Sequence, residues 1–235
     1  MWPTVVMDGP IRTHPNNDPG GASSQRSACI RRLIYDCPKQ PTRGRSRSGM
    51  AKLVYVANVS LDGFIEDAQG RFGWTEPSDD VFTFITGLVR PMGTHLYGRR
   101  LYETMAVWEL DPDLAAGSEL MADFARTWQA ADKVVYSTTL QTIPTGRARL
   151  ERRFDPDAVR ELKASAASDV VIGGATIAAR AFDAGLIDEC HHFVYPVLVG
   201  AGKSAFSGDG PVQMTLLEEQ RFDSGVVYLR YRIMS

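Results

Sequence analysis

The fold is decided by the stretch Asp169-Val170-Val171-Ile172-Gly173-Gly174-Ala175-Thr176-Ile177-Ala178-Ala179. Its first part is a short apolar, β-branched run of strand length, and small residues follow the two glycines in the manner of a helix. Glycine permits backbone angles closed to other residues and has no side chain to block a ligand. The unpaired N–H groups and positive dipole end of the helix suit a phosphate bound over the glycines. A plain tight connection fits the same motif, so its meaning depends on the rest of the chain.

The first 49 residues differ in composition from the rest of the 235-residue chain. They hold eight basic side chains against three acidic ones and six of the 13 prolines, without a sustained period of 2 or 3.6. Such a segment cannot bury enough apolar surface to offset the entropy of ordering it. We therefore expect a disordered basic tail over 1–49 and one globular domain over 50–235. The alternative is that translation begins at Met50 and that the tail is an artefact of start-site choice.

Composition narrows the classes of function. The run Thr42-Arg43-Gly44-Arg45-Ser46-Arg47-Ser48 fits contact with nucleic acid or a membrane, but a solvated tail explains it as well. The remainder is net acidic, which argues against nucleic-acid binding. The sequence has no signal-peptide h-region and no run of 18 apolar residues. Cys29, Cys37 and Cys190 match no zinc spacing, so we expect no metal site and a reducing, cytoplasmic location.

The domain alternates strands and helices before it ends in a hairpin. Strands are expected at 52–59, 94–97, 133–137, 170–172 and 189–194, with helices beginning near Ser78, Arg99, Ser118, Asp155 and Gly174. The hairpin is expected from 212–222 and 226–233, around the turn at 223–225. This order predicts an α/β fold of three layers, with helices on both faces of an open, mostly parallel sheet and an antiparallel C-terminal edge.

Polar and glycine-rich groups follow three of these strands. In open α/β sheets, ligands bind beyond the carboxyl ends of the strands. Arg99 and Arg100 begin a helix, where positive charge is unfavourable, and no carboxylate partner is evident nearby in the sequence; an anionic ligand would resolve this. Ser137 and Thr138 either donate to the same phosphate or cap the following turn. Three strand ends together predict an anion site: Gly98-Arg99-Arg100, Ser137-Thr138 and Gly173-Gly174-Ala175-Thr176.

A carboxylate is the candidate acid–base group. Asp79 and Asp80 lie at the start of a helix after an aromatic loop, where an acid also serves as an ordinary helix cap. In the functional interpretation, Trp74 walls a flat pocket while Asp79 hydrogen-bonds an amino-heterocycle and helps to protonate it. An aromatic enclosure would raise the pKa of that carboxylate, as acid–base work at neutral pH requires.

These residues together resemble the dihydrofolate reductase superfamily, and within it the reductase (C-terminal) domain of the bifunctional riboflavin-biosynthesis deaminase–reductase. The resemblance covers about residues 52–233. It depends on short motifs in a shared order: Ser60-Leu61-Asp62-Gly63, Gly73-Trp74, Gly98-Arg99-Arg100 with Tyr102-Glu103, Val171-Ile172-Gly173-Gly174 and Pro196-Val197-Leu198-Val199-Gly200-Ala201-Gly202.

The resemblance implies a dihydrofolate-reductase-like fold and an NADPH-dependent reductase acting on a pterin or a ribosylaminopyrimidine. It places Gly98, Arg99 and Arg100 on the 2′-phosphate side of NADPH, assisted by Ser137 and Thr138. The pyrophosphate would lie on Ile172, Gly173, Gly174, Ala175 and Thr176, with the nicotinamide beside Ala57. The spacing Trp74-x-x-Pro77-x-Asp79 matches the step from tryptophan to substrate carboxylate, so Trp74 and Asp79 would be catalytic, and Asp62 and Asp79 would bind substrate.

Two departures from the family pattern affect the substrate and cofactor assignments. Leu101 stands where dihydrofolate reductases commonly have threonine, and the loop after the first strand is acidic where riboflavin enzymes carry basic residues. No deaminase zinc motif is present. The alternative to a reductase is a non-catalytic protein that binds or senses NADPH. The family resemblance also allows a homodimer.

Overall fold

The computed structural model describes residues 50–208 and 210–234; the predicted tail over 1–49 lies outside them. The elements follow in the order β1 (Leu53–Ser60), β2 (Phe64–Asp67), η1 (Gly73–Thr75), α1 (Asp79–Val89), β3 (Thr94–Gly98), α2 (Arg99–Leu110), α3 (Pro112–Ala115), α4 (Glu119–Ala130), β4 (Asp132–Tyr136), β5 (Ala148–Glu151), α5 (Pro156–Ser165), β6 (Val170–Gly173), α6 (Ala175–Asp183), β7 (Glu189–Tyr195), β8 (Gly202–Ser204), β9 (Met214–Arg221) and β10 (Val227–Ile233).

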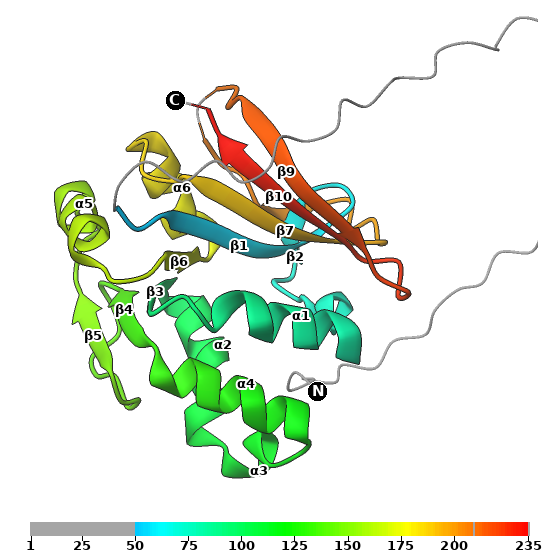
Figure 1. Cartoon of the computed structure of the whole chain (residues 1–235), viewed down its shortest axis with the longest axis horizontal. Helices are drawn as coiled ribbons and strands as arrows, with labels where there is room; N and C mark the ends of the chain where they lie inside the picture. The colour runs from blue at the N-terminus through cyan, green and yellow to red at the C-terminus, as the bar shows by residue number, and fades with distance from the viewer. Residues whose placement is uncertain (1–49, 209, 235) are drawn as a thin grey trace, which may run out of the picture. The chain divides into compact units, whose positions relative to one another are not determined.

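Eight of the strands form one sheet in the order β5-β4-β3-β6-β1-β7-β10-β9 (Figure 1). Pairing is parallel from β5 to β7, and β10 then runs antiparallel to both β7 and β9. The strand that opens the Gly-Gly motif, β6, lies between β3 and β1, so the motif sits at the centre of the parallel part. The predicted parallel sheet with an antiparallel C-terminal hairpin is confirmed.

Helices cover both faces of the parallel strands (Figure 1). On one face, α1, α2 and α4 pack against residues such as Tyr97 and Val135. On the other, α5 and α6 pack against their chain neighbours, Leu96 and Val134. Successive strand residues point to opposite faces, so a strand covered on both sides is apolar throughout. This explains the continuous apolar runs of β1 and β6 and confirms the predicted three layers.

The layer formed by α1, α2 and α4 is fixed by aromatic packing. Trp108 of α2 is almost fully buried and lies 5.9 Å from the ring of Phe82 and 4.8 Å from that of Phe124. Replacing a buried tryptophan or phenylalanine with alanine typically costs about 3–5 kcal/mol. These contacts fix α2 against α1 and α4.

A second, two-stranded sheet was not predicted. The antiparallel pair β2 and β8 joins the loop expected after the first strand to residues 202–204, where no strand was expected. Gly202 makes the pairing possible, because a Cβ at this position would lie 1.9 Å from the backbone oxygen of Glu66. Both strands are too short to show a period of 2, so no local pattern indicated them. None of the helices that the structure describes combines the length and hydropathy needed to cross a membrane.

Candidate functional site

A cavity of about 540 Å³ lies at the carboxyl ends of β1, β3, β4 and β6. This is the size of an ordinary small-molecule site. Its lining contains all but one of the residues that the sequence assigned to a cofactor: Ala57, Gly98, Arg99, Arg100, Ser137, Thr138, Gly173, Gly174, Ala175 and Thr176. The exception, Ile172, packs into the core against α5 and α6, directly behind the glycines. The predicted convergence of three strand ends on one crevice is therefore observed.

The N-terminus of α6 opens onto this cavity without a cap. Its N-cap, Gly174, has φ +96° and makes no side-chain hydrogen bond to the helix, and the first turn holds no acid. That backbone conformation suits glycine and strains other residues. Gly173 meets a different demand, since a Cβ there would lie 2.5 Å from the Leu101 side chain. Leu101, one of the departures from the family pattern, thus packs directly over the first glycine.

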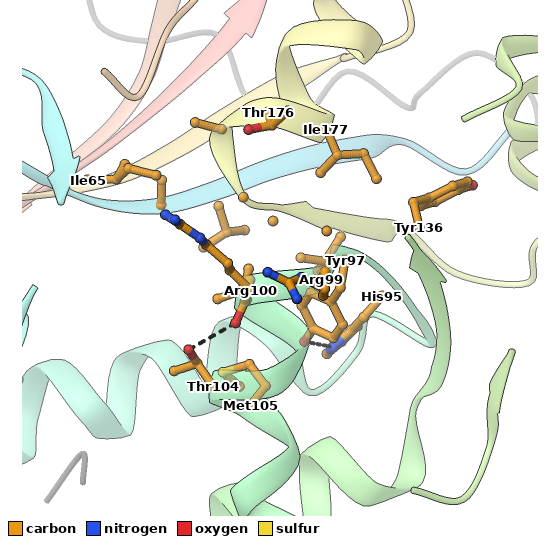
Figure 2. A pocket seen from close by; sticks show the side chains of 18 of the residues that line it. Ile65, His95, Tyr97, Arg99, Arg100, Thr104, Met105, Tyr136, Thr176 and Ile177 are labelled. Atoms are coloured by element: carbon orange, nitrogen blue, oxygen red, sulfur yellow. Dashed lines mark hydrogen bonds between the residues drawn. The ribbon is translucent and has the colours of Figure 1, made fainter. Parts of the chain in front are cut away.

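The N-terminus of α2 faces the same space. Its N-cap is also a glycine, Gly98, again without a side-chain cap or an acid in the first turn. The two N-caps are close, because a Cβ built on Gly174 would lie 3.9 Å from the Gly98 nitrogen. Figure 2 shows Arg99 and Arg100 on one side of the cavity and Thr176 on the other. Two positive helix ends therefore converge on one volume, which favours an anion there.

Arg100 has a carboxylate partner that was not evident nearby in the sequence. Its Nη1 lies 3.0 Å from Oε1 of Glu66 on β2, and Figure 2 shows its side chain extending toward the neighbouring Ile65. Glu66 is distant in sequence and reaches α2 only through the small β2–β8 sheet. Arg99 makes a looser contact of 3.9 Å with Glu103 on its own helix. Arg99 is therefore the less committed of the two guanidinium groups.

Ser137 has a structural role at the end of β4. Its hydroxyl oxygen accepts hydrogen bonds from the backbone nitrogens of Thr139 (3.2 Å) and Leu140 (2.9 Å). This is the turn-capping alternative considered for the sequence. The hydroxyl still lines the cavity, beside the exposed Thr138. A serine that accepts two backbone bonds keeps its proton for donation, so capping and ligand binding are compatible.

Asp62 fastens two loops to each other. Its carboxylate accepts hydrogen bonds from the Ser60 hydroxyl (2.6 Å) and from the backbone nitrogens of Val199 (3.1 Å) and Gly200 (2.7 Å). The hydrogen bonds from Ser60 and Gly200 lower the pKa of Asp62 to about 2. The carboxylate does not line the cavity. The geometry therefore gives Asp62 a loop-positioning role, where the resemblance implied substrate binding.

The structure does not bring Asp79 or Trp74 into the cavity lining. Asp79 is exposed and lies with the turn between β9 and β10 around a separate, shallow depression. The reason is helix rotation. The buried face of α1 includes Val81, and two residues along a helix correspond to a turn of about 200°, which carries Asp79 to the outer side. Trp74 packs edge-on against Tyr195, with ring centroids 6.0 Å apart. Asp79 is thus exposed, whereas an aromatic enclosure was expected around it.

A buried polar chain lies in the cavity wall and was not predicted. His95 Nδ1 lies 2.8 Å from the Tyr97 hydroxyl, which also accepts a hydrogen bond of 3.2 Å from Trp128 Nε1. Burial lowers the pKa of His95 to about 4 and raises the pKa of Tyr97, so both side chains are neutral at pH 7. His95 and Tyr97 alternate on β3, and this spacing of two was the signal available in the sequence.

Other lining residues also went unnoticed in the sequence: Glu66, Tyr136, Arg152, Phe154, Arg180 and Lys203. Arg152 follows β5 as Ser137 follows β4, so the same strand-end argument applies to it. It was missed because the four residues of β5 carry no recognisable strand pattern. Tyr136 and Phe154 form an aromatic pair in this part of the cavity, with centroids 5.3 Å apart.

Comparisons with known proteins agree with this geometry. Residues 51–228 match the family model of the RibD C-terminal domain. An uncharacterised protein of Bacillus subtilis strain 168, YyaP, is 26% identical over 185 residues, which cover 77% of this chain and 94% of YyaP.

Solved structures show the same fold. A Shewanella sp. PV-4 protein provisionally assigned to riboflavin biosynthesis aligns with a TM-score of 0.62 and 19% identity, over 78% of this chain and 99% of that one. Acinetobacter baumannii RibD aligns with a TM-score of 0.57 and 18% identity, over 79% of this chain and 59% of RibD. Dihydrofolate reductase from Enterococcus faecalis, complexed with NADP(H) and RAB-propyl, aligns with a TM-score of 0.54 and 12% identity. This alignment covers 78% of this chain and 97% of the reductase. The fold is thus dihydrofolate-reductase-like, and the chain belongs to the RibD C-terminal domain family.

Proposed function

We propose that this protein is an NADPH-dependent reductase that transfers a hydride to a pterin or ribosylaminopyrimidine-type heterocycle. The observation that carries the proposal is the meeting of two uncapped helix N-termini, at Gly98 and Gly174, in a cavity at the strand ends. Such an arrangement binds phosphates with backbone N–H groups and helix dipoles. The family match and a fold shared with a dihydrofolate reductase complexed with NADP(H) support the same cofactor.

The residues present fit NADPH. The N-terminus of α6, from Gly173 to Thr176, would hold the pyrophosphate, because its N–H groups lack any side-chain acceptor among the described residues. Arg99 and the hydroxyls of Ser137 and Thr138 would contact the adenosine half, and Ala57 would lie beside the nicotinamide. When bound, the cofactor supplies the hydride, while the protein aligns the two reactants and keeps water away.

The remaining wall suits a flat heterocycle. Apolar side chains from β1, α1 and β7 line it, including Val56, Ile85 and Phe193. Glu66 supplies the only carboxylate in the described lining, and its side chain is 17% exposed. A carboxylate is the group that recognises the amino and ring N–H donors of pterins and aminopyrimidines. The geometry thus favours Glu66 for the hydrogen-bonding role, whereas the family spacing favours Asp79.

The second candidate is a non-catalytic protein that binds or senses NADPH. One observation favours it: neither Trp74 nor Asp79, the expected catalytic pair, lines the cavity. Both candidates require cofactor binding, so only turnover separates them.

The test has two stages. NADPH binding is measured by fluorescence titration, and NADPH oxidation is then followed with dihydrofolate and with the ribosylaminouracil phosphate, using wild type, Glu66→Gln and Asp79→Asn. Turnover that falls at least tenfold in Glu66→Gln but less than threefold in Asp79→Asn would support the reductase with Glu66 at the substrate. The reverse pattern would support Asp79. Tight NADPH binding without turnover of either compound would favour the sensor, and absence of NADPH binding would reject both candidates.

A further inference from the structure

We propose that Arg152 selects NADPH over NADH by binding the phosphomonoester on the adenosine ribose, and that Arg100 does not. This inference rests on the proposed function, because it assigns a residue to a cofactor that the function requires. Arg152 belongs to none of the motifs that relate the sequence to dihydrofolate reductases. Its role follows from the distribution of charge along the cavity.

The cavity is electrically asymmetric. Its lining holds one carboxylate and several cations, namely Glu66 against Arg99, Arg100, Arg152, Arg180 and Lys203. Glu66 lies on β2, opposite Lys203 of β8 in the sheet register, and binds Arg100 at 3.0 Å. The end of the cavity beneath the small sheet is therefore partly neutralised. A doubly charged phosphate that approached Arg100 would also meet the Glu66 carboxylate.

The opposite end, at β4 and β5, carries an uncompensated cation. Nη1 of Arg152 donates to the backbone oxygens of Leu140 (2.6 Å) and Ser137 (3.3 Å). These bonds hold the guanidinium over the end of β4, next to Thr138. In the described part of the chain, no carboxylate lies within the 4.0 Å of an ion pair with Arg152, and its other nitrogens have no hydrogen-bond acceptor. A guanidinium fixed through one nitrogen presents its remaining donors as a fork, which matches a phosphate.

The nearest acids are engaged elsewhere. Glu151 lies 3.3 Å from the Nε of Arg149, and Asp155 caps α5 by accepting a bond of 2.9 Å from the Asp157 nitrogen. Neither carboxylate forms an ion pair with Arg152. The positive charge of this end therefore remains available to a ligand.

The order of the strands sets the direction of the cofactor. The strands whose ends bear Arg152, Ser137, Arg99 and Gly173 are successive neighbours, in the order β5-β4-β3-β6. Strands lie about 4.8 Å apart, so β5 is roughly 14 Å from the Gly173–Gly174 seat. A dinucleotide with its pyrophosphate on α6 and its nicotinamide beside Ala57 would extend its adenosine along this edge. Tyr136 and Phe154 offer aromatic surface there, and Arg152 would contact the phosphate of the ribose.

The experiment compares two neighbouring arginines in the full-length chain. Arg153 is exposed and does not line the cavity, so Arg153→Gln is the matched control for Arg152→Gln. Dissociation constants are measured for NADPH, NADH, 2′,5′-ADP and 5′-AMP. We expect Arg152→Gln to weaken the binding of NADPH and 2′,5′-ADP at least tenfold. The dissociation constants of NADH and 5′-AMP should change less than twofold. Arg153→Gln should leave all four unchanged. Intact binding of 5′-AMP shows that the variant is folded.

A second variant separates charge from shape. Arg152→Lys keeps the charge and loses the fork, so we expect it to retain part of the preference for 2′,5′-ADP over 5′-AMP. Retention of the full preference in Arg152→Gln, or its loss in Arg100→Gln with Arg152→Gln unaffected, would overturn the inference. A wild type that binds NADPH and NADH equally would also overturn it while leaving a dinucleotide-dependent reductase in place. A wild type that binds neither would instead reject the proposed function.

Discussion

The N-termini of α2 and α6 differ from those of α4 and α5. Ser118 caps α4 by accepting a hydrogen bond of 3.2 Å from the Met121 nitrogen, and Asp155 caps α5 in the same way. Both helices carry an acid in the first turn, Glu119 and Asp157. Gly98 and Gly174, the N-caps of α2 and α6, provide no side-chain acceptor, and neither first turn contains an acid.

This difference separates helix N-termini that the protein satisfies itself from N-termini that it leaves open toward the cavity. A side-chain cap is worth about 1 kcal/mol, and an acid near the helix N-terminus adds a few tenths. Among the α-helices of the described chain, only α2 and α6 omit the acid, and both begin at the cavity. Arg99 and Arg100 make the start of α2 still less favourable alone. A bound phosphate would supply the stabilisation that a side-chain cap and an acid provide at other helix N-termini.

The largest expected effect comes from filling one uncapped end. Gly174→Asp would supply α6 with the acid that it lacks and place a negative charge in the anion seat. We expect NADPH binding to weaken at least a thousandfold, which corresponds to about 4 kcal/mol. Gly185→Asp is the control, because Gly185 follows the same helix, also has a positive φ, and has open space around it. Equal NADPH affinities in the two variants, measured by fluorescence titration, would remove the distinction between α6 and the capped helices.

A second prediction concerns buried histidines inside and outside the cavity region. His95 lines the cavity, while His192, on β7, packs against the rings of Tyr55 and Phe206. Burial lowers the pKa of each to about 4 from an ordinary value near 6.5. The unfolded chain therefore binds more protons between these values, and the free energy of unfolding falls as the pH drops from 6.5 to 4.

Each histidine is expected to contribute up to about 3 kcal/mol of this loss, with the full stability present above pH 6.5. Urea unfolding at pH 7 and pH 5 measures the effect, and His192→Gln should reduce the difference by about 2 kcal/mol. Its NADPH affinity should match that of wild type, since His192 lies outside the cavity. An unchanged pH dependence in His192→Gln would show that this histidine is not held neutral by burial.

The parts of the candidate site that could be predicted from the sequence are those formed by residues close together in the chain. Val170 to Gly174 form a strand and a helix start whose signals lie within a few residues, so the seat on α6 was predictable. Glu66 and Arg152 depend on β2 and β5, short strands stabilised by partners far along the chain. Local pattern does not encode those pairings. Asp79 shows a different limit: the family spacing identifies a position on α1, but packing sets the rotation of the helix.

Removing the side-chain caps of α4 and α5 tests whether these two helix N-termini serve only the stability of the fold. Ser118→Ala and Asp155→Ala should each lower the free energy of unfolding by about 1 kcal/mol, because each leaves a backbone N–H without its acceptor. NADPH affinity should change by less than twofold in both variants. Urea unfolding and fluorescence titration on the same preparations measure the two quantities. A loss of NADPH binding as large as that in Gly174→Asp would mean that capped helix ends also serve the ligand.

The smallest expected effect concerns Glu66, an acid from outside α2 that reaches its uncapped N-terminus. Glu66 contacts Arg100 at the start of α2, where the first turn of the helix itself holds no acid. The Arg100 side chain is 70% exposed, and solvent-exposed ion pairs contribute about 0.2–1 kcal/mol. A double-mutant cycle with Glu66→Gln and Arg100→Gln, followed by urea unfolding, should give a coupling of about 0.5 kcal/mol. A coupling above about 2 kcal/mol would mean that Glu66 stabilises the start of α2 as a cap does. In that case α2 would join the capped helices, and α6 alone would remain as the ligand's anchor.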